Sequence, residues 1–214
     1  MGVVSKRSTM TYFSDPNCHY SHRVRIVLAE KGITVDVVNS DPLAPTQELA
    51  ELNPYGTLPT LLDRELVLYQ TPVIMEYLDE RFPHPPLLPV YPVARAEIRQ
   101  FIHRIQDDWC SLIDKMTNFP GTKDAQKAAK QLEDSLVTIA PVFGEKPYFM
   151  SDEFTIVDCC LAPILWRLDD WGISIPKTRQ TLPLFNYMER MFNRESFQAS
   201  LTDFERDLRT NFAA

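Results

Sequence analysis

Apolar and polar residues follow two different rhythms along this chain. As far as Phe82, apolar residues come in short runs rich in β-branched and aromatic side chains, which is typical of β-strands separated by turns. From Val93 onward they recur at intervals of three and four, which places them on one face of an α-helix. The pattern therefore predicts a mixed α/β part followed by an all-helical part.

The first part has the order of a β-α-β unit, a short helix, and a β-hairpin followed by a helix. Gly32 stands directly after a helical stretch, at the position where helix C-termini favour glycine. Strands joined through a helix by short turns run parallel. The expected elements are a strand at Thr9–Phe13, a helix from His19 or Tyr20 to Lys31, a strand at Thr34–Val38, at most a short helix at Pro45–Leu52, strands at Pro59–Leu62 and Leu66–Tyr69, and a helix capped by Thr71 with Pro72 at its first position.

The second part predicts longer helices. In the third of them, Thr155 is the expected N-cap, and Asp158 stands where its carboxylate can reach back to the cap. The charged tail is expected to be a short helix that frays. The expected ranges are Val93 to about Met116, Asp124 to about Ala140, a helix that opens at Thr155, Leu182 to about Phe192, and the tail Ser200–Ala214.

A proline-rich segment separates the two parts. Five of the 17 prolines fall between Pro83 and Pro92, and such a segment favours polyproline II over helix or inner strand. We therefore expect two domains, at residues 8–82 and 92–214, joined by a stiff linker at residues 83–91.

Charge and hydropathy narrow the range of functions. The 214 residues include 22 Lys and Arg against 29 Asp and Glu, for a formal charge of −7, which opposes binding to phosphate backbones. The densest cationic stretch, His22–Arg25, opens a helix that should pack partly against the sheet, so direct DNA binding is the least favoured function.

No apolar run reaches the roughly 18 residues of a membrane helix. Met1–Met10 lacks the apolar run of a signal peptide, so we expect a cytoplasmic protein without membrane contact.

The cysteines and histidines do not suggest a metal site. The four cysteines match no zinc-binding spacing, and the four histidines are scattered along the chain. Cys159 and Cys160 lie in an apolar stretch and are interpreted as small core residues. We expect no metal and no cofactor, and thiols that stay reduced in the cytoplasm.

Two motifs suggest thiol chemistry. Cys18 stands at the start of a helix in a Cys-x-x-Ser pattern, where partly positive N–H groups favour the thiolate. In the second motif, Pro59 opens a strand, and a cis peptide before it would leave the backbone of Leu58 facing a cleft, which suits pairing with an extended thiol peptide. The alternatives are a loop cysteine without a role and a turn followed by an edge strand.

A third motif, Gln70-Thr71, lies at the start of the helix after the hairpin. An amide and a hydroxyl at a helix N-terminus bind a carboxylate well. The alternative for Thr71 is a simple helix cap, which is the better interpretation of that residue taken alone.

Taken together, these motifs resemble the glutathione S-transferase superfamily. The resemblance implies a thioredoxin-like N-terminal domain, an all-helical C-terminal domain, and a homodimer built across both. It also implies that Ser14 or Cys18 carries the sulfur chemistry, that Leu58 pairs with glutathione through its backbone, and that Gln70 and Thr71 hold the γ-glutamyl end. The matching segments are the loop from Ser14 to Cys18, Arg23–Leu28, Asn53–Pro59, Gln70-Thr71 and the Thr155-to-Asp158 capping box.

A narrower resemblance covers both domains and the linker. The chain is similar to the bacterial stringent starvation protein A family, and the run Pro83-His84-Pro85-Pro86 is its most specific segment. This resemblance implies association with RNA polymerase holoenzyme during starvation, stationary phase or acid stress, without transferase catalysis. An acidic protein suits contact with basic protein surfaces. The matching stretches are 24–32, 75–87, 89–95, 140–143, 147–153 and 163–168.

Two functions from different classes follow. In the first, a rigid proline ridge binds the polymerase, with His84 and Tyr91 as contacts. Its expected residues are Pro83, His84, Pro85, Pro86 and Tyr91. In the second, the chain is a glutathione-dependent transferase or a thiol–disulfide reductase that uses Cys18. His19 stands where redox-active relatives have proline, so we expect this cleft to be vestigial. Its expected residues are Ser14, Cys18, Leu58, Pro59, Gln70 and Thr71.

Overall fold

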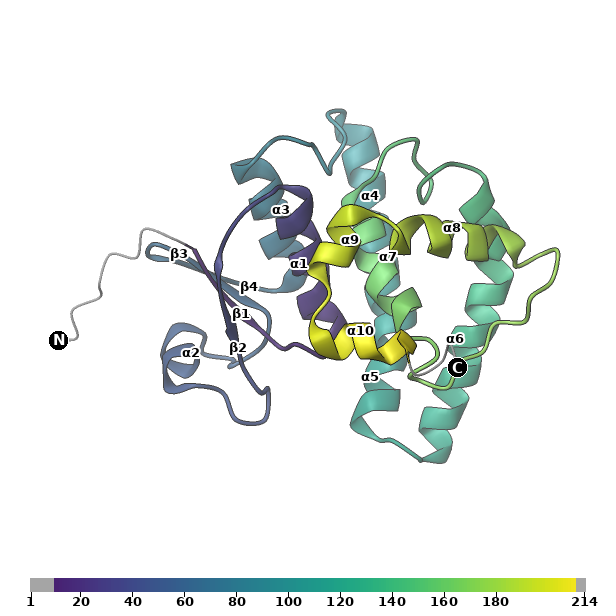
Figure 1. Ribbon diagram of the computed structural model, residues 1–214, viewed down its shortest axis with the longest axis horizontal. Helices are drawn as coiled ribbons and strands as arrows, with labels where there is room; N and C mark the ends of the chain where they lie inside the picture. The colour runs from purple at the N-terminus through teal and green to yellow at the C-terminus, as the bar shows by residue number, and fades with distance from the viewer. Residues whose placement is uncertain (1–9, 211–214) are drawn as a thin grey trace. The chain divides into compact units, whose positions relative to one another are not determined.

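The computed structural model describes residues 10–210, which form two compact units (Figure 1). The N-terminal unit comprises the described residues up to Pro85 together with Ala199–Asp207, and the helical unit comprises Pro86–Gln198 and the described residues from Leu208. The expected start of the first domain at residue 8, Thr9 of the first expected strand, Met1–Ser8 of the N-terminal segment and the last four residues of the tail lie outside the described residues.

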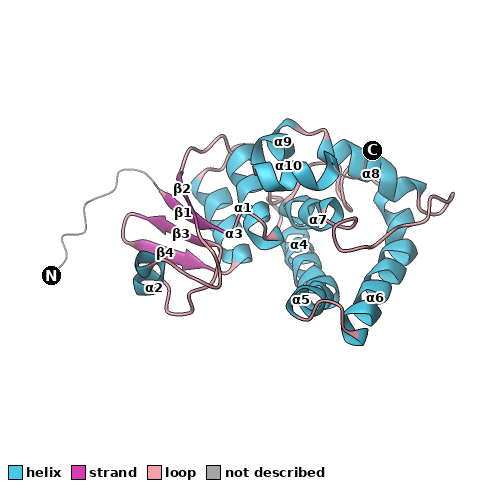
Figure 2. Ribbon diagram, turned by 60° about the horizontal axis from the view of Figure 1, so that its bottom comes forward, coloured by secondary structure: helices cyan, strands magenta, loops and turns pink. Residues whose placement is uncertain are grey.

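The N-terminal unit contains a four-stranded sheet with the order β2-β1-β3-β4. The predicted β-α-β unit is confirmed, because β1 and β2 pair in parallel, while β3 is antiparallel to both β1 and β4. Helices α1 and α3 pack together on one face of the sheet, and α2 lies on the other (Figures 1 and 2). The elements are β1 Thr11–Ser14, α1 His19–Glu30, β2 Asp36–Asn39, α2 Gln47–Leu52, β3 Thr60–Asp63, β4 Leu66–Tyr69 and α3 Thr71–Arg81.

The core of this unit follows from the sequence pattern. All four residues of β1 are buried, and α1 contributes an unbroken buried stretch from Ser21 to Leu28. Gly32 has a φ of 61°, and Ile33 N donates to Leu28 O at 2.9 Å, so the predicted glycine stop of α1 is confirmed.

The predicted N-cap of α3 is wrong by a single residue. Helix α3 begins at Thr71, so the N-cap is Gln70 and not Thr71. The backbone decides this, because Ile74 N donates to Gln70 O at 3.1 Å. Pro72 accordingly occupies the second helical position, where its missing N–H is still unneeded.

The helical unit is built around α7, in which every residue is buried. The expected helix over Val93–Met116 is continuous but contains a π-helical turn at Ile105–Cys110. Cys159 and Cys160 are fully buried, as expected of core residues. The helices are α4 Pro92–Arg104, α5 Ser111–Asn118, α6 Lys123–Ile139, α7 Ile156–Trp166, α8 Leu182–Phe192, α9 Glu195–Ser200 and α10 Asp203–Thr210, the last two of which extend across the boundary between the units.

The capping box at the start of α7 is confirmed. Asp158 Oδ2 accepts from Thr155 N at 2.8 Å, and Thr155 Oγ1 accepts from Val157 N at 3.2 Å. Asp158 Oδ1 also accepts from Phe149 N at 3.0 Å and from the Tyr187 hydroxyl at 2.7 Å. A single carboxylate therefore ties α7 to the preceding loop and to α8. Within residues 10–210, every helix is too short or too polar to span a lipid bilayer.

Candidate functional site

The strand register brings the three predicted thiol-site segments to one edge of the sheet. Ser14, the last residue of β1, pairs with Asn39, the last residue of β2. Thr60, the first residue of β3, pairs with Phe13 and with Tyr69, the last residue of β4. The loop from Ser14 to Cys18, the segment Leu58-Pro59 and the segment Gln70-Thr71 all follow or precede these strand ends. The structure therefore groups Ser14, Cys18, Leu58, Pro59, Gln70 and Thr71 at this edge.

Ser14 is fully buried and its hydroxyl is engaged by the protein itself. The Ser14 Oγ accepts from Arg25 Nη1 at 2.8 Å. Arg25 also donates to Ser200 O at 3.0 Å and forms an ion pair with Glu205 at 2.5 Å. The charge-assisted bond from Arg25 makes Ser14 a structural partner of the guanidinium. A hydroxyl in this position has no open face for activating a thiol.

Cys18 is half-buried and caps α1. Its Sγ accepts from Tyr20 N at 3.3 Å, which places the sulfur at the positive end of the helix. Ser21, the fourth residue of the Cys-x-x-Ser pattern, is buried, and its Oγ accepts from Asp15 N at 3.1 Å. His19 is also buried, and its Nδ1 lies 3.3 Å from Arg23 Nη2. At the start of α1, the Cys18 sulfur is therefore partly accessible, whereas the neighbouring His19 and Ser21 are buried and contact other residues of the protein.

The Leu58-Pro59 peptide bond is cis, as the sequence pattern anticipates. Pro59 is buried and Leu58 is half-buried. The buried Asn53 shapes the loop before them, since its Nδ2 donates to Thr57 O at 3.1 Å and to Thr60 Oγ1 at 3.0 Å. A side-chain network that the sequence pattern does not indicate thus holds Thr57 and Thr60, the residues on either side of Leu58-Pro59.

Gln70 and Thr71 differ in accessibility. Gln70 is exposed and has a φ of 73°, whereas Thr71 is buried in the first turn of α3. Of this pair, Gln70 is the one available to a ligand.

The predicted partner-binding residues are exposed. Pro83, His84 and Pro85 close the first stretch of the N-terminal unit, and Pro86 opens the helical unit. Tyr91, which precedes α4, is 77% exposed. The His84-Pro85 peptide bond is cis.

A buried lysine binds the backbone of the proline segment, Pro83–Pro86, at Pro85. Lys31 lies just past α1, and its Nζ donates to the carbonyl of Pro85 and to Asp79 Oδ1, the second contact at 2.5 Å. The Lys31 side chain is fully buried and that of Asp79 nearly so. The backbone at Pro85 is thus held from inside, while the His84 side chain remains exposed.

The acidic, histidine and cysteine side chains of residues 10–210 bear on whether the protein holds a metal ion. Across these residues, no group of three or more His, Cys, Asp or Glu side chains is arranged to hold a metal ion. None of the four cysteines forms a disulfide bond, and Cys18 is the one of the four that is not fully buried.

Comparison with known proteins gives a consistent picture. Residues 17–81 match the family described as "Glutathione S-transferase, N-terminal domain", and residues 99–195 match "Glutathione S-transferase, C-terminal domain". The stringent starvation protein A homolog of Coxiella burnetii is 53% identical, over 95% of this chain and 97% of its own length. The homolog of Haemophilus influenzae is 50% identical, over 92% of each chain. The chain belongs to the stringent starvation protein A family.

Solved structures confirm the fold of this family member. The tau-class glutathione S-transferase of Mangifera indica superposes with a TM-score of 0.79 at 19% identity, covering 98% of this chain and 99% of that one. Maleylacetoacetate isomerase of Anaeromyxobacter dehalogenans, solved with bound GSH, superposes with a TM-score of 0.72 at 26% identity, covering 90% and 94%. The predicted glutathione S-transferase-like fold, a thioredoxin-like unit and an all-helical unit, is therefore confirmed.

Several residues that position these segments carry no signal in the sequence pattern. Lys31 and Asp79 stand in expected helical stretches, and Glu205 stands in the charged tail that is expected to be a short helix that frays. Each carboxylate is the partner of a buried basic residue: Asp79 pairs with Lys31, and Glu205 pairs with Arg25. The sequence alone does not show that these basic residues are buried.

Proposed function

We propose that this stringent starvation protein A family member is an RNA polymerase-associated regulator of transcription. It acts by protein–protein contact with the holoenzyme during starvation, stationary phase or acid stress, and it does not depend on glutathione transferase catalysis. The observation that carries the proposal is the proline segment of Pro83–Pro86, which is exposed at its side chains and held at the Pro85 carbonyl by the buried Lys31. A surface with a fixed backbone loses little conformational entropy on binding.

The charge of the chain supports a protein partner. A net charge of −7 favours basic protein surfaces over nucleic acid, so we propose that the chain does not bind DNA or RNA alone. His84 provides an exposed polar contact, and Tyr91 provides a large amphipathic side chain of the kind enriched at interface hot spots.

Co-elution with RNA polymerase holoenzyme on a sizing column tests this function. The wild-type chain should co-elute at several salt concentrations. His84→Ala should weaken association about tenfold, as loss of one well-packed interface residue does. Replacing Pro83 to Pro86 by alanine should abolish co-elution.

The matched control for His84→Ala is His103→Ala, because His103 is also an exposed histidine but lies on α4. It should bind like the wild type. Circular dichroism should show that each variant is folded. Undiminished co-elution of the four-residue variant would contradict the proposal.

We also propose that the chain forms a homodimer, on the resemblance to the superfamily. Val90 and Val93, three positions apart in the chain, are 83% and 73% exposed, and two exposed apolar side chains this close in sequence suit a surface that a second copy covers. Sedimentation equilibrium at micromolar concentration should give twice the monomer mass of 24.7 kDa. A monomer mass under these conditions would rule the dimer out.

A second candidate function is glutathione-dependent chemistry at Cys18, favoured by the position of its sulfur at the N-terminus of α1. The burial of Ser14 and Thr71 argues against it. Calorimetric titration with low-millimolar glutathione should show no saturable binding. Binding that Cys18→Ala or Gln70→Ala removes, and that the exposed control Gln126→Ala leaves intact, would favour this second function instead.

A further inference from the structure

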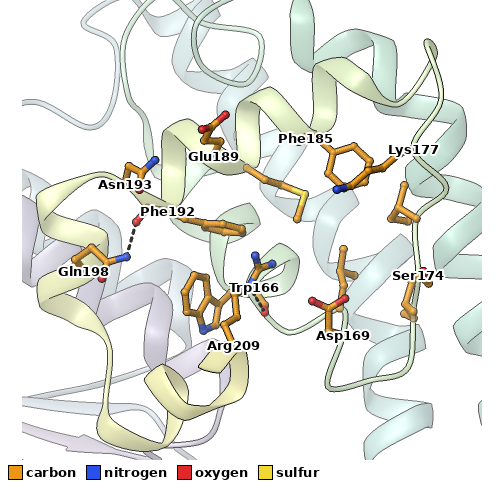
Figure 3. A pocket seen from close by; sticks show the side chains of 14 residues that line it. Trp166, Asp169, Ser174, Lys177, Phe185, Glu189, Phe192, Asn193, Gln198 and Arg209 are labelled. Atoms are coloured by element: carbon orange, nitrogen blue, oxygen red, sulfur yellow. Dashed lines mark hydrogen bonds between the residues drawn. The ribbon is translucent and has the colours of Figure 1, made fainter. Parts of the chain in front are cut away.

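The helical unit contains a cavity of about 610 Å³ that neither candidate function uses. The C-terminal end of α7, the following loop through Lys177, helix α8 and Arg209 on α10 surround it (Figure 3). The volume lies in the range of small-molecule sites. Its floor is made of buried apolar residues: Trp166, Leu168, Ile173, Ile175, Met188 and Phe192.

Arg209 forms one charged wall of the cavity. Its guanidinium carbon lies 4.7 Å from the centre of the Trp166 ring and 4.4 Å from that of Phe192. Its nitrogens donate to the carbonyls of Leu165 at 3.3 Å and Trp166 at 3.5 Å. Among residues 10–210, no carboxylate forms an ion pair with this guanidinium. A partly desolvated cation whose direct contacts are ring faces and long bonds to carbonyls gains from a nearby anion.

The pKa of Arg209 agrees with this description. Burial lowers the pKa of the guanidinium, and the charge of Asp169 opposes the effect only in part. The cation is therefore incompletely compensated by the protein.

Lys177 provides a second cation at the edge of the cavity. It is exposed, and its Nζ lies 5.5 Å from the centre of the Phe185 ring. The two acidic residues of the lining are Asp169 and Glu189. Figure 3 shows Glu189 projecting from α8 away from the centre of the cavity, whereas Asp169 projects toward Arg209. The groups that face the interior are therefore two cations and one carboxylate, over an apolar and aromatic floor.

We propose that this cavity binds a small organic anion with a flat, apolar body, such as an aromatic carboxylate. The acid group is held by Lys177 and Arg209, and the body packs on the apolar floor against Met188 and Phe185. Aromatic and thioether side chains favour a ring in this position. The site lies wholly within the helical unit and is independent of the proline segment.

A series of naphthalene compounds with different charges tests the proposal on the full-length chain. The probes are 2-naphthoate, 2-naphthalenemethanol and 2-naphthylmethylammonium, which share a ring system and differ in charge. Calorimetric titration should rank the carboxylate about tenfold tighter than the alcohol, with the ammonium weakest, because one charge-assisted contact contributes about this factor.

Two variants locate the site. Lys177→Gln should reduce naphthoate affinity about tenfold and leave the alcohol unchanged, whereas Lys146→Gln, an exposed lysine elsewhere in the unit, should change neither. Ser174→Trp adds a bulky ring at an exposed lining position and should abolish binding of both probes. Lys177 is preferred to Arg209 because Arg209 supports the end of α7, so its loss also affects folding.

Several results would overturn the proposal. Equal affinity for the three probes would show a purely apolar cavity. Preference for the ammonium would assign the site to Asp169 and a cationic ligand. Absence of binding at millimolar naphthoate, or naphthoate binding that Lys177→Gln and Ser174→Trp leave intact, would remove the cavity as an anion site.

Discussion

Arg25 and Glu205 lie 180 positions apart in the chain and form a buried ion pair, with 2.5 Å between Nη2 and Oε1. The same carboxylate caps α10, because its Oε2 accepts from Thr202 N at 2.9 Å and Glu205 N donates to Thr202 Oγ1 at 3.2 Å. Its Oε1 also lies 3.5 Å from His22 Nδ1. One acidic residue near the C-terminus therefore completes the polar interior of the N-terminal unit.

Removing the charge of Glu205 should destabilise the protein strongly. Glu205→Gln leaves the Arg25 guanidinium buried without a counter-charge, which costs about 3–5 kcal/mol. Urea unfolding followed by circular dichroism should show the loss as a lower midpoint. Replacing both partners, Arg25→Met with Glu205→Leu, should recover most of it, because an apolar pair of similar size needs no charge compensation.

The control for this experiment is Glu195→Gln, which changes an exposed glutamate near the same end of the chain. Its midpoint should equal that of the wild type. An unchanged midpoint in Glu205→Gln would show that the ion pair contributes nothing to stability.

Substitution of Asp158 should also destabilise the protein, by less than substitution of Glu205 and for a different reason. Asp158→Asn keeps the shape of the side chain but puts an amide where both carboxylate oxygens accept hydrogen bonds from Thr155, Phe149 and Tyr187. Loss of charged acceptors of this kind costs about 1.5–3 kcal/mol. The exposed Asp152→Asn is the matched control, and equal urea midpoints for the two variants would refute the prediction.

Asp158 should also make the stability of the protein depend on pH. Burial raises the pKa of this carboxyl above its ordinary value of 3.8, although hydrogen bonds from Phe149, Tyr187 and Thr155 oppose the rise. The folded state then binds the proton more tightly than the unfolded chain does. The stability gained from protonation is present below pH 3.8 and is lost as the pH rises through the folded-state pKa.

Urea midpoints measured from pH 3.8 upward, for the wild type and Asp158→Asn, test this sign. The wild type should lose stability with rising pH relative to the variant, which has no proton to release at this position. A wild type that gains stability over the variant in this window would show that the hydrogen bonds outweigh burial and lower the pKa.

The role of Lys31 links the interior to the proposed polymerase surface. Lys31→Met removes the contacts to Pro85 and Asp79 without altering any exposed residue of the segment. If the fixed backbone matters for binding, association with the holoenzyme should fall several-fold, because the segment must then be ordered on binding. The double variant Lys31→Met with Asp79→Asn separates this effect from the cost of an unpaired buried carboxylate.

Co-elution of these two variants is compared with that of Lys130→Met, which changes an exposed lysine on α6. Full binding by folded Lys31→Met would show that the anchoring contact is irrelevant to the interface. That result would not test the role of the His84 side chain, which His84→Ala tests separately.

Local signals in the sequence predicted much of the fold. The Gly32 stop, the hairpin around Asp63 to Glu65, and the capping box at Thr155 depend on neighbouring residues, and each is present in the structure. The π-helical turn at Ile105–Cys110 was not predicted, because apolar spacings of three and four persist through it. A single extra residue in a turn leaves no trace in such a pattern.

The environment of the candidate thiol site was less predictable. Ser14 was a reasonable candidate by position, but its hydroxyl is occupied by Arg25, and Arg25 is in turn neutralised by a residue from the far end of the chain. Glu205 lies in a charged tail that was expected to fray, and it is fully buried. Residues distant in sequence decide these contacts, so local patterns do not reveal them.

Because Ala199–Asp207 belong to the N-terminal unit, this unit cannot be completed early in synthesis of the chain. The ribosome releases residues up to Pro85 early, but Ala199–Asp207, which complete the same unit, emerge only after roughly 110 further residues. At 5–20 residues per second, this delay is about 5–20 s. During it, Arg25 and His22 have no carboxylate from Glu205, so the first part of the chain to be made cannot reach its final structure until Ala199–Asp207 have emerged.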